Sequence, residues 1–126
     1  MLLDTCFLIQ LQREFRRGEP GRAVDFLETN AGHEFCISVI SVTEFLEGFE
    51  RIHEGERLLR SYRRIDLNSQ IASQAAIYRR ELRFSGQLIG DFDILIGATA
   101  AVEGLPLVTD NLAHFGRLEG VSLVGY

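Results

Sequence analysis

Lysine is absent from this chain, and all thirteen of its basic residues are arginine. The planar fork of arginine suits phosphate better than a point charge does. However, the formal net charge is −5 at pH 7. Because nonspecific nucleic-acid binding depends on neutralising phosphates, this balance argues against a general nucleic-acid coat protein.

Long apolar runs and cysteines are also scarce. No apolar run approaches the ~20 residues that span a bilayer, and the start, Met1-Leu-Leu-Asp4, lacks the basic flank and apolar core of a signal peptide. The two cysteines, Cys6 and Cys36, make neither a disulfide framework nor a zinc motif. Their apolar neighbours predict buried free thiols in a reducing compartment. We therefore expect a cytoplasmic protein without a membrane segment.

Short apolar runs alternate with segments of helical periodicity. The expected strands cover residues 1–4, 35–40, 64–67, 105–109 and 121–126, and the expected helices cover 5–17, 23–30, 41–52, 68–84 and 91–101, with a helical turn at 111–115. Because strands that alternate with helices form parallel sheets, we predict an α/β fold in three layers, with a mostly parallel central sheet flanked by helices. The length suits a single domain over residues 1–126.

Several acids fall where a predicted strand gives way to a helix: Asp4, Glu44, Asp91, Asp93 and Asp110. If the strands are parallel, all these junctions meet at one sheet edge, where open α/β sheets bind ligands. Crowded carboxylates repel one another and usually need a cation or protons to coexist. Since oxygen ligands select Mg²⁺ or Mn²⁺ over zinc, the pattern predicts a divalent-metal site suited to phosphodiester hydrolysis.

Each acid also has an ordinary structural explanation. Asp4 fits a helix N-cap, and Ser41 with Glu44 matches a capping box. Asp91 and Asp93 lie in the first turn of a helix, where the macrodipole favours acids. No histidine neighbours these acids in sequence, and a surface role is expected for each of the three: His33, His53 and His114.

Four segments resemble, in order, the successive motifs of PIN-domain ribonucleases, and most of all the VapC-type toxins of toxin–antitoxin modules. They are Leu3-Asp4-Thr5, Ser41–Gly48, Asp93–Ala100 and Leu107–Phe115. The resemblance covers the whole chain. It implies an endoribonuclease that depends on Mg²⁺ or Mn²⁺, forms a homodimer and is held inactive by a small antitoxin whose C-terminal segment enters the acidic groove.

By position, Asp4, Glu44 and Asp93 match the first three acids of that family. The resemblance makes Asp4 and Asp93 the expected metal ligands and Glu44 the residue that positions a water or a second ion. The family's usual last acid lies two residues after the threonine. That position is Asn111 here, while Asp110 lies one residue earlier. Both stay candidates for the fourth position of the catalytic site.

The other candidates have smaller expected roles. Asp91 is interpreted chiefly as the N-cap of its helix, with metal contact as the alternative. Thr5 and Thr109 are candidates for orienting a carboxylate or a scissile phosphate, although packing explains them equally well. The arginines expected to bind the RNA backbone are Arg13, Arg17 and Arg83.

Two other phosphate-handling families begin with a similar aspartate and fit less well. A phosphatase of the haloacid dehalogenase type needs a second aspartate at the position of Cys6, and it needs a lysine. A phospho-receiver domain needs a lysine too. The alternative that stays open is a PIN fold that binds RNA or a protein without cutting, because the fourth acid is not assigned.

Overall fold

The structure is a computed structural model that describes all 126 residues. Its sheet has five parallel strands: β1 (Leu2–Leu3), β2 (Cys36–Ser38), β3 (Arg63–Ile65), β4 (Leu107–Val108) and β5 (Leu123–Val124). Their order is β3-β2-β1-β4-β5. The chain builds outward from β1 to β3 and then crosses to β4, so the topological switch point lies between β1 and β4, and the predicted parallel sheet is confirmed.

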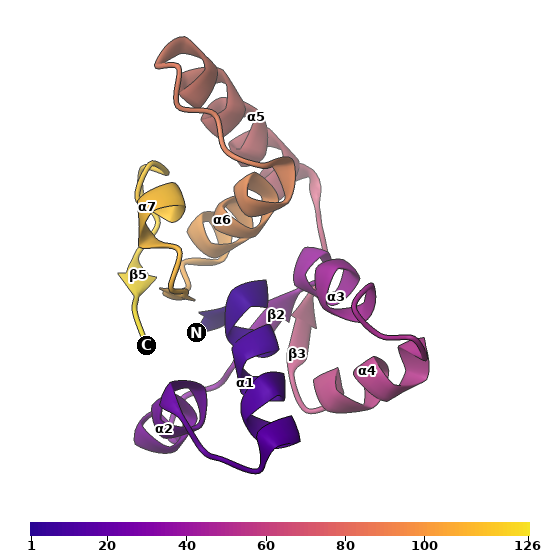
Figure 1. The fold of residues 1–126 in the computed structure, drawn as a ribbon. Helices are drawn as coiled ribbons and strands as arrows, with labels where there is room; N and C mark the ends of the chain where they lie inside the picture. Colours follow the sequence, from indigo (N-terminus) through magenta and orange to yellow (C-terminus); the bar gives the residue numbers. More distant parts are fainter.

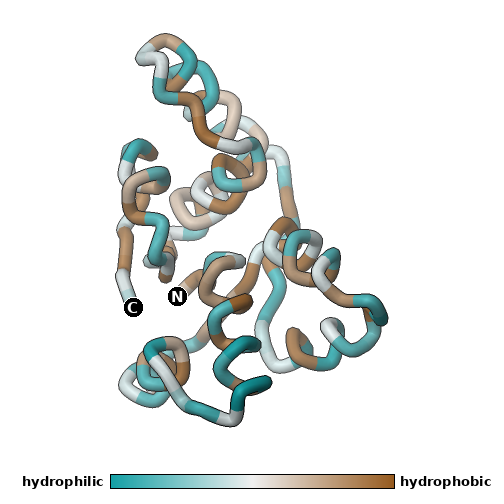
Figure 2. The backbone as a smooth tube through the Cα atoms, in the orientation of Figure 1, coloured by the Kyte–Doolittle hydropathy of each residue, from teal (hydrophilic) through white to brown (hydrophobic).

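Seven helices surround the sheet (Figure 1): α1 (Thr5–Arg17), α2 (Arg22–Thr29), α3 (Val39–Leu46), α4 (Ile52–Leu59), α5 (Ser69–Phe84), α6 (Asp91–Glu103) and α7 (Leu112–Phe115). None combines the length and apolarity needed to cross a membrane. The residues at the end of α1 and in the turn that follows it are mostly hydrophilic (Figure 2).

Strand residues alternate between two cores, as the pleat requires. One face of the sheet packs against α5 and α6 through Leu2, Cys36 and Leu107. The opposite face packs against α1 and α3 through Leu3, Ile37 and Val108. The sheet is therefore the middle of three layers, which confirms the predicted fold class.

Several predicted boundaries differ from the structure, two of them by enough to change an element. The expected strand over 35–40 ends at Ser38, because the Ser38 hydroxyl accepts a hydrogen bond from the Ile40 backbone N–H at 3.1 Å and starts α3. This N-cap overrides the strand preference of Val39 and Ile40. The expected helix over 41–52 is two helices, α3 and α4, separated by residues 47–51. By contrast, Asn68 caps α5 as predicted, accepting from the Ile71 N–H at 3.0 Å.

A buried carboxylate on α1 fixes the start of α2. Glu14 accepts hydrogen bonds from the backbone N–H groups of Gly21, Ala23 and Val24 at 3.0, 3.1 and 3.0 Å, and from the Gln10 amide at 2.9 Å. The first helical turn has no partners within the helix for these N–H groups. Glu14 therefore caps α2 from the preceding helix, and Gly21 leaves room for it, since a Cβ there would lie 2.9 Å from the carboxyl group.

Candidate active site

Thr5 links Asp4 to Glu44 through two hydrogen bonds. Asp4 is 4% exposed. It caps α1 by accepting the Thr5 N–H at 2.8 Å. The Thr5 hydroxyl donates to Glu44 Oε1 at 2.7 Å. Glu44 thus bonds to α1 across the sheet edge, and the capping-box interpretation of Ser41 with Glu44 is wrong. Buried Ser41 has no hydrogen-bond partner for its hydroxyl.

The second oxygen of Asp4 is held from the neighbouring strand. The Thr109 hydroxyl and the Cys6 thiol both donate to Asp4 Oδ2 at 2.8 Å. Cys6 is a free cysteine, as expected, but it is only partly buried, so the prediction of a buried thiol is wrong for this residue and confirmed for Cys36. Asp4 therefore has hydrogen-bond donors on both oxygens and a fixed orientation at the switch point between β1 and β4.

The carboxylates at this edge influence one another. Burial raises the pKa of Asp4, and the nearby Asp93 charge adds to the rise, which the hydrogen bonds from Cys6, Thr109 and Thr5 oppose. Burial also raises the pKa of Glu44, with the charges of Asp4 and Asp93 adding to it. Burial and the Asp4 charge raise the pKa of Cys6 to about 12, so the thiol stays a donor. The tertiary structure thus brings Asp4, Glu44 and Asp93 into one group of acids.

Two further acids pair with arginine instead. Asp110 Oδ2 lies 2.8 Å from Arg22 Nη2. Contact with Cys6 and with Arg22 lowers the pKa of Asp110. Asp91 Oδ1 lies 3.1 Å from Arg79 Nε. The N-cap of α6 is Gly90, so the interpretation of Asp91 as that cap is wrong.

Sequence reasoning missed one residue of the site. His114 Nδ1 lies 3.5 Å from Asp93 Oδ2 and 3.0 Å from the Asn111 side-chain nitrogen. His114 is exposed, as expected, but its contact with Asp93 was not predicted. A signal was present, because residues three apart in a helical turn lie on the same side, and Asn111 was already a candidate.

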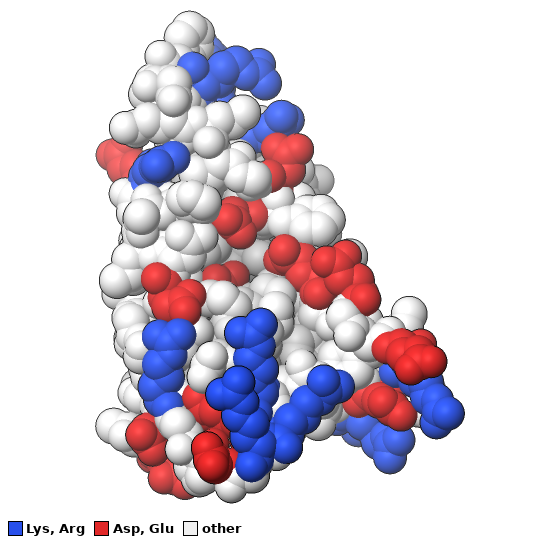
Figure 3. All heavy atoms as spheres, viewed as in Figure 1, with Lys and Arg blue, Asp and Glu red and all other residues white.

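The three predicted RNA-binding arginines are exposed. Arg13 and Arg17 lie on α1, which starts at the acids and runs away from them, and Arg83 lies in the last turn of α5. At a rise of roughly 1.5 Å per residue, Arg13 is about 13 Å along the helix from Asp4. Figure 3 shows acidic side chains across the middle of one face of the molecule, with arginines above and below them.

The donor set at the sheet edge fits a hard divalent cation. Asp4, Glu44 and Asp93 offer oxygen only, and a cation would offset both the burial and the weaker mutual repulsion that raise the pKa values of Asp4 and Glu44. No group of three or more histidine, cysteine or acidic side chains is arranged so that it could hold a metal ion by itself. Mg²⁺ usually binds one or two carboxylates directly and keeps several waters, which such an open arrangement allows.

The fold and this edge define a class: a parallel α/β domain with an acidic site at its topological switch point. A profile of the PIN domain family matches residues 1–120. "Ribonuclease VapC2" of Haemophilus influenzae is 32% identical over an alignment of 124 residues, which covers 93% of this chain and 90% of that protein. The "tRNA(fMet)-specific endonuclease VapC" of Salmonella typhimurium is 30% identical over 95 residues, covering 70% of this chain and 72% of that protein.

A solved structure agrees with these relatives. The "Toxin-antitoxin complex from Klebsiella pneumoniae" has a chain that is 28% identical to this one, with a TM-score of 0.74. The match covers 98% of this chain and 94% of that one. The chain therefore belongs to the PIN domain family, as a member of the VapC type. The resemblance found in the sequence is confirmed.

Proposed function

We propose that this protein is a metal-dependent endoribonuclease and the toxin of a toxin–antitoxin pair. The observation that carries the proposal is the group formed by Asp4, Glu44 and Asp93 at the carboxyl edge of the sheet, with Thr5 bonded to two of them. The names of the VapC relatives support the reaction class, and the toxin–antitoxin complex supports the partner.

In this mechanism Asp4 and Asp93 would hold Mg²⁺ or Mn²⁺, and Glu44, with help from Asp110 or Asn111, would position the attacking water. The ion, when bound, supplies Lewis-acid stabilisation and makes the bound water more acidic. Thr5 keeps Glu44 aimed at the site through its 2.7 Å hydrogen bond. Attack by water on phosphorus breaks the bond to the 3′ oxygen and leaves 5′-phosphate and 3′-hydroxyl ends.

We propose that the RNA backbone is bound by Arg13, Arg17 and Arg83 on either side of the acids. Single-stranded loops are the favoured targets, because proteins read unstacked bases most easily. The specificity stated in the name of the Salmonella relative makes transfer RNA the first substrate class to test.

Removal of the metal is expected to stop the reaction. The antitoxin-free protein should cut an end-labelled pool of structured RNA that includes transfer RNAs when Mn²⁺ or Mg²⁺ is present. Cleavage should stop with EDTA and return when excess metal is added, because the acids alone supply no Lewis acid. If the folded protein binds Mn²⁺ but cuts no RNA in the pool, a PIN module that binds without cutting becomes the better explanation.

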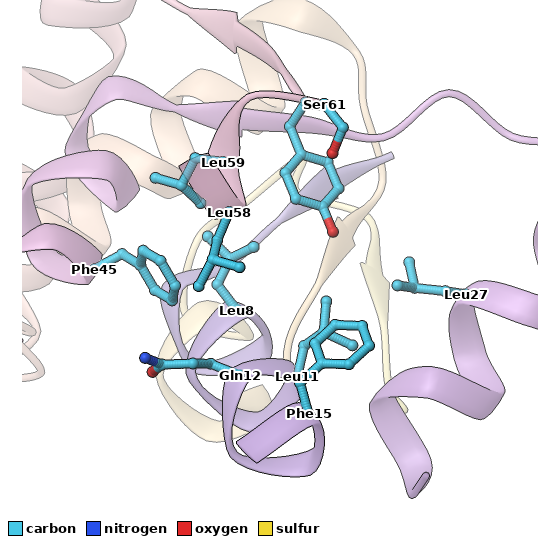
Figure 4. Close-up of a pocket in the computed structure, with 10 residues that line it drawn as sticks. Leu8, Leu11, Gln12, Phe15, Leu27, Phe45, Leu58, Leu59 and Ser61 are labelled. Atoms are coloured by element: carbon cyan, nitrogen blue, oxygen red, sulfur yellow. The ribbon is translucent and has the colours of Figure 1, made fainter. Parts of the chain in front are cut away.

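We propose that the antitoxin docks in an apolar groove between α1 and α4. The groove has a volume of about 190 Å³. Its lining includes Leu8, Leu11, Gln12, Phe15, Leu27, Phe45, Leu58, Leu59 and Ser61 (Figure 4). Phe15 is 64% exposed and Leu58 is 47% exposed, whereas Phe45 is part of the core, as expected. An exposed apolar groove of this kind fits the apolar face of a partner helix.

A charge placed in this groove should weaken antitoxin binding. Leu58→Asp is expected to reduce affinity for the cognate antitoxin at least about 30-fold, because a central apolar contact is worth about 2 kcal/mol or more. RNA cleavage should be unchanged, since Leu58 does not contact the acids. Calorimetric titration measures the affinity, and Leu67→Asp, at an exposed leucine outside the groove, is the control. Equal affinities of the wild type and Leu58→Asp would place the antitoxin elsewhere.

The homodimer stays a prediction. Exposed apolar side chains on and after α5 offer a surface for it: Ile77, Phe84, Leu88 and Phe92.

A further inference from the structure

A series of hydrogen bonds and polar contacts through the β4–α7 loop links the two proposed metal ligands, Asp4 and Asp93. The Thr109 hydroxyl donates to Asp4 and accepts from the Asn111 backbone N–H at 3.0 Å. The Asn111 side chain contacts His114 Nδ1 at 3.0 Å, and this nitrogen lies 3.5 Å from Asp93 Oδ2. The path therefore ends on the carboxylate of the second proposed ligand.

Close packing places this loop beside α6. A Cβ at Gly97 would lie 2.2 Å from Leu118 Cδ1 and 3.6 Å from Phe115 Cδ1, and both of these side chains are buried. Gly97 is four residues after Asp93 and so lies on the same side of α6. Because Gly97 has no side chain, Leu118, which follows α7, packs directly against α6 beside this loop.

The loop supplies hydrogen-bonding groups where the family resemblance leads one to expect a fourth acid. Asn111 stands at that position, and the charge of neighbouring Asp110 is already matched by Arg22. A carboxylate only accepts hydrogen bonds, so His114 Nδ1, 3.5 Å from Asp93 Oδ2, can bond to it only when Nδ1 carries the proton. In that tautomer the Asn111 amide has to turn its oxygen toward Nδ1, because its nitrogen, 3.0 Å away, is a donor as well.

We propose that His114 is a positioning residue: through Nδ1 it orients the Asp93 carboxylate toward the divalent ion, and Asn111 orients His114. This inference rests on the proposed function, since it assumes that Asp93 binds the metal. Partners of this kind, one step removed from a metal, typically change metal affinity 10–100-fold when they are removed.

The test measures Mn²⁺ binding to the RNA-free protein by calorimetry, together with cleavage over a range of Mn²⁺ concentrations. His114→Ala should bind Mn²⁺ roughly 10–100-fold more weakly. Its cleavage rate at saturating Mn²⁺ should stay close to that of the wild type, because the metal ligands themselves are intact. His114→Asn should restore most of the affinity, since its amide nitrogen takes the place of Nδ1. His114→Gln should not, since its amide lies near the position of Nε2.

A matched control is His53→Ala, at an exposed histidine on α4. Two results would overturn the proposal: wild-type Mn²⁺ affinity in His114→Ala, or equal weakness in His114→Ala and His114→Asn. A wild type that binds no Mn²⁺ would overturn it too, together with metal dependence. A wild type that binds Mn²⁺ but cuts no RNA, with weaker binding in His114→Ala, would uphold the positioning role and reject the nuclease function.

Discussion

Asp4→Asn is expected to fold normally and to cut RNA at least about 10²–10³-fold more slowly than the wild type, and Asp93→Asn is expected to do the same. Losses of this size follow when a group that stabilises charge in the transition state is removed. In Asp4→Asn the backbone cap is kept, because the amide oxygen still accepts the Thr5 N–H. What is lost is the negative charge that attracts the ion and the acceptor for the Thr109 hydroxyl and the Cys6 thiol, both of which can turn to accept from the new amide N–H groups.

The stability of Asp4→Asn should not fall with its activity. Burial raises the pKa of Asp4 above its ordinary value. A carboxyl group with a raised folded-state pKa destabilises the fold above that pKa, and the destabilisation disappears below the unfolded-state pKa. At neutral pH without metal, the substitution is therefore expected to leave the melting temperature unchanged or to raise it, as at many functional sites.

Thermal melts with and without Mn²⁺ check this expectation beside the cleavage assay. An ion present at 100 times its Kd stabilises a protein by about 2.7 kcal/mol. The wild type should show a metal-dependent rise in Tm, and Asp4→Asn should show none. Asp25→Asn, at an exposed position on α2, should behave as the wild type in both assays. If Asp4→Asn cuts RNA at the wild-type rate, the assignment of the site is wrong.

Glu14→Ala is expected to cause the largest loss of stability, about 2–4 kcal/mol in the free energy of unfolding. The substitution leaves three backbone N–H groups at the start of α2 without their carboxylate acceptor. Loss of a helix cap typically costs about 0.5–2 kcal/mol, and each unsatisfied buried donor costs about 1–3 kcal/mol. Urea denaturation measures the change, and Glu28→Ala, at an exposed position on α2, is the control.

The same residue makes the fold sensitive to acid. Burial by itself raises the pKa of Glu14, but the hydrogen bonds from Gln10, Val24, Ala23 and Gly21 outweigh it and lower the pKa below 4.5. A carboxyl group with a lowered folded-state pKa stabilises the fold above the unfolded-state pKa and loses this effect as pH falls through the folded-state pKa. The advantage of the wild type over Glu14→Gln should therefore shrink below about pH 4.5. An advantage that does not change with pH would contradict the role of the charge.

Local patterns carried much of the prediction. The alternation of apolar runs and amphipathic segments predicted the parallel sheet, and Asn68 before an apolar periodic segment predicted the start of α5. The helix boundary at 38–41 was wrong because Ser38 and Ser41 both have hydroxyl groups suited to an N-cap. Nothing local distinguishes them, whereas in the fold Ser38 ends a strand and Ser41 is buried within α3.

The layers, the order of the motifs and the acids that follow the strands were predictable, because they depend on periodicity and on neighbours along the chain. Which polar groups meet became known from the fold. Thr5 bonds to Glu44 across 39 positions and Arg22 to Asp110 across 88. The contact of His114 with Asp93 joins α7 to α6, and Leu118 packs against Gly97 of α6 nearby. Such contacts depend on how helices pack and on which side chains leave room, which no local pattern records.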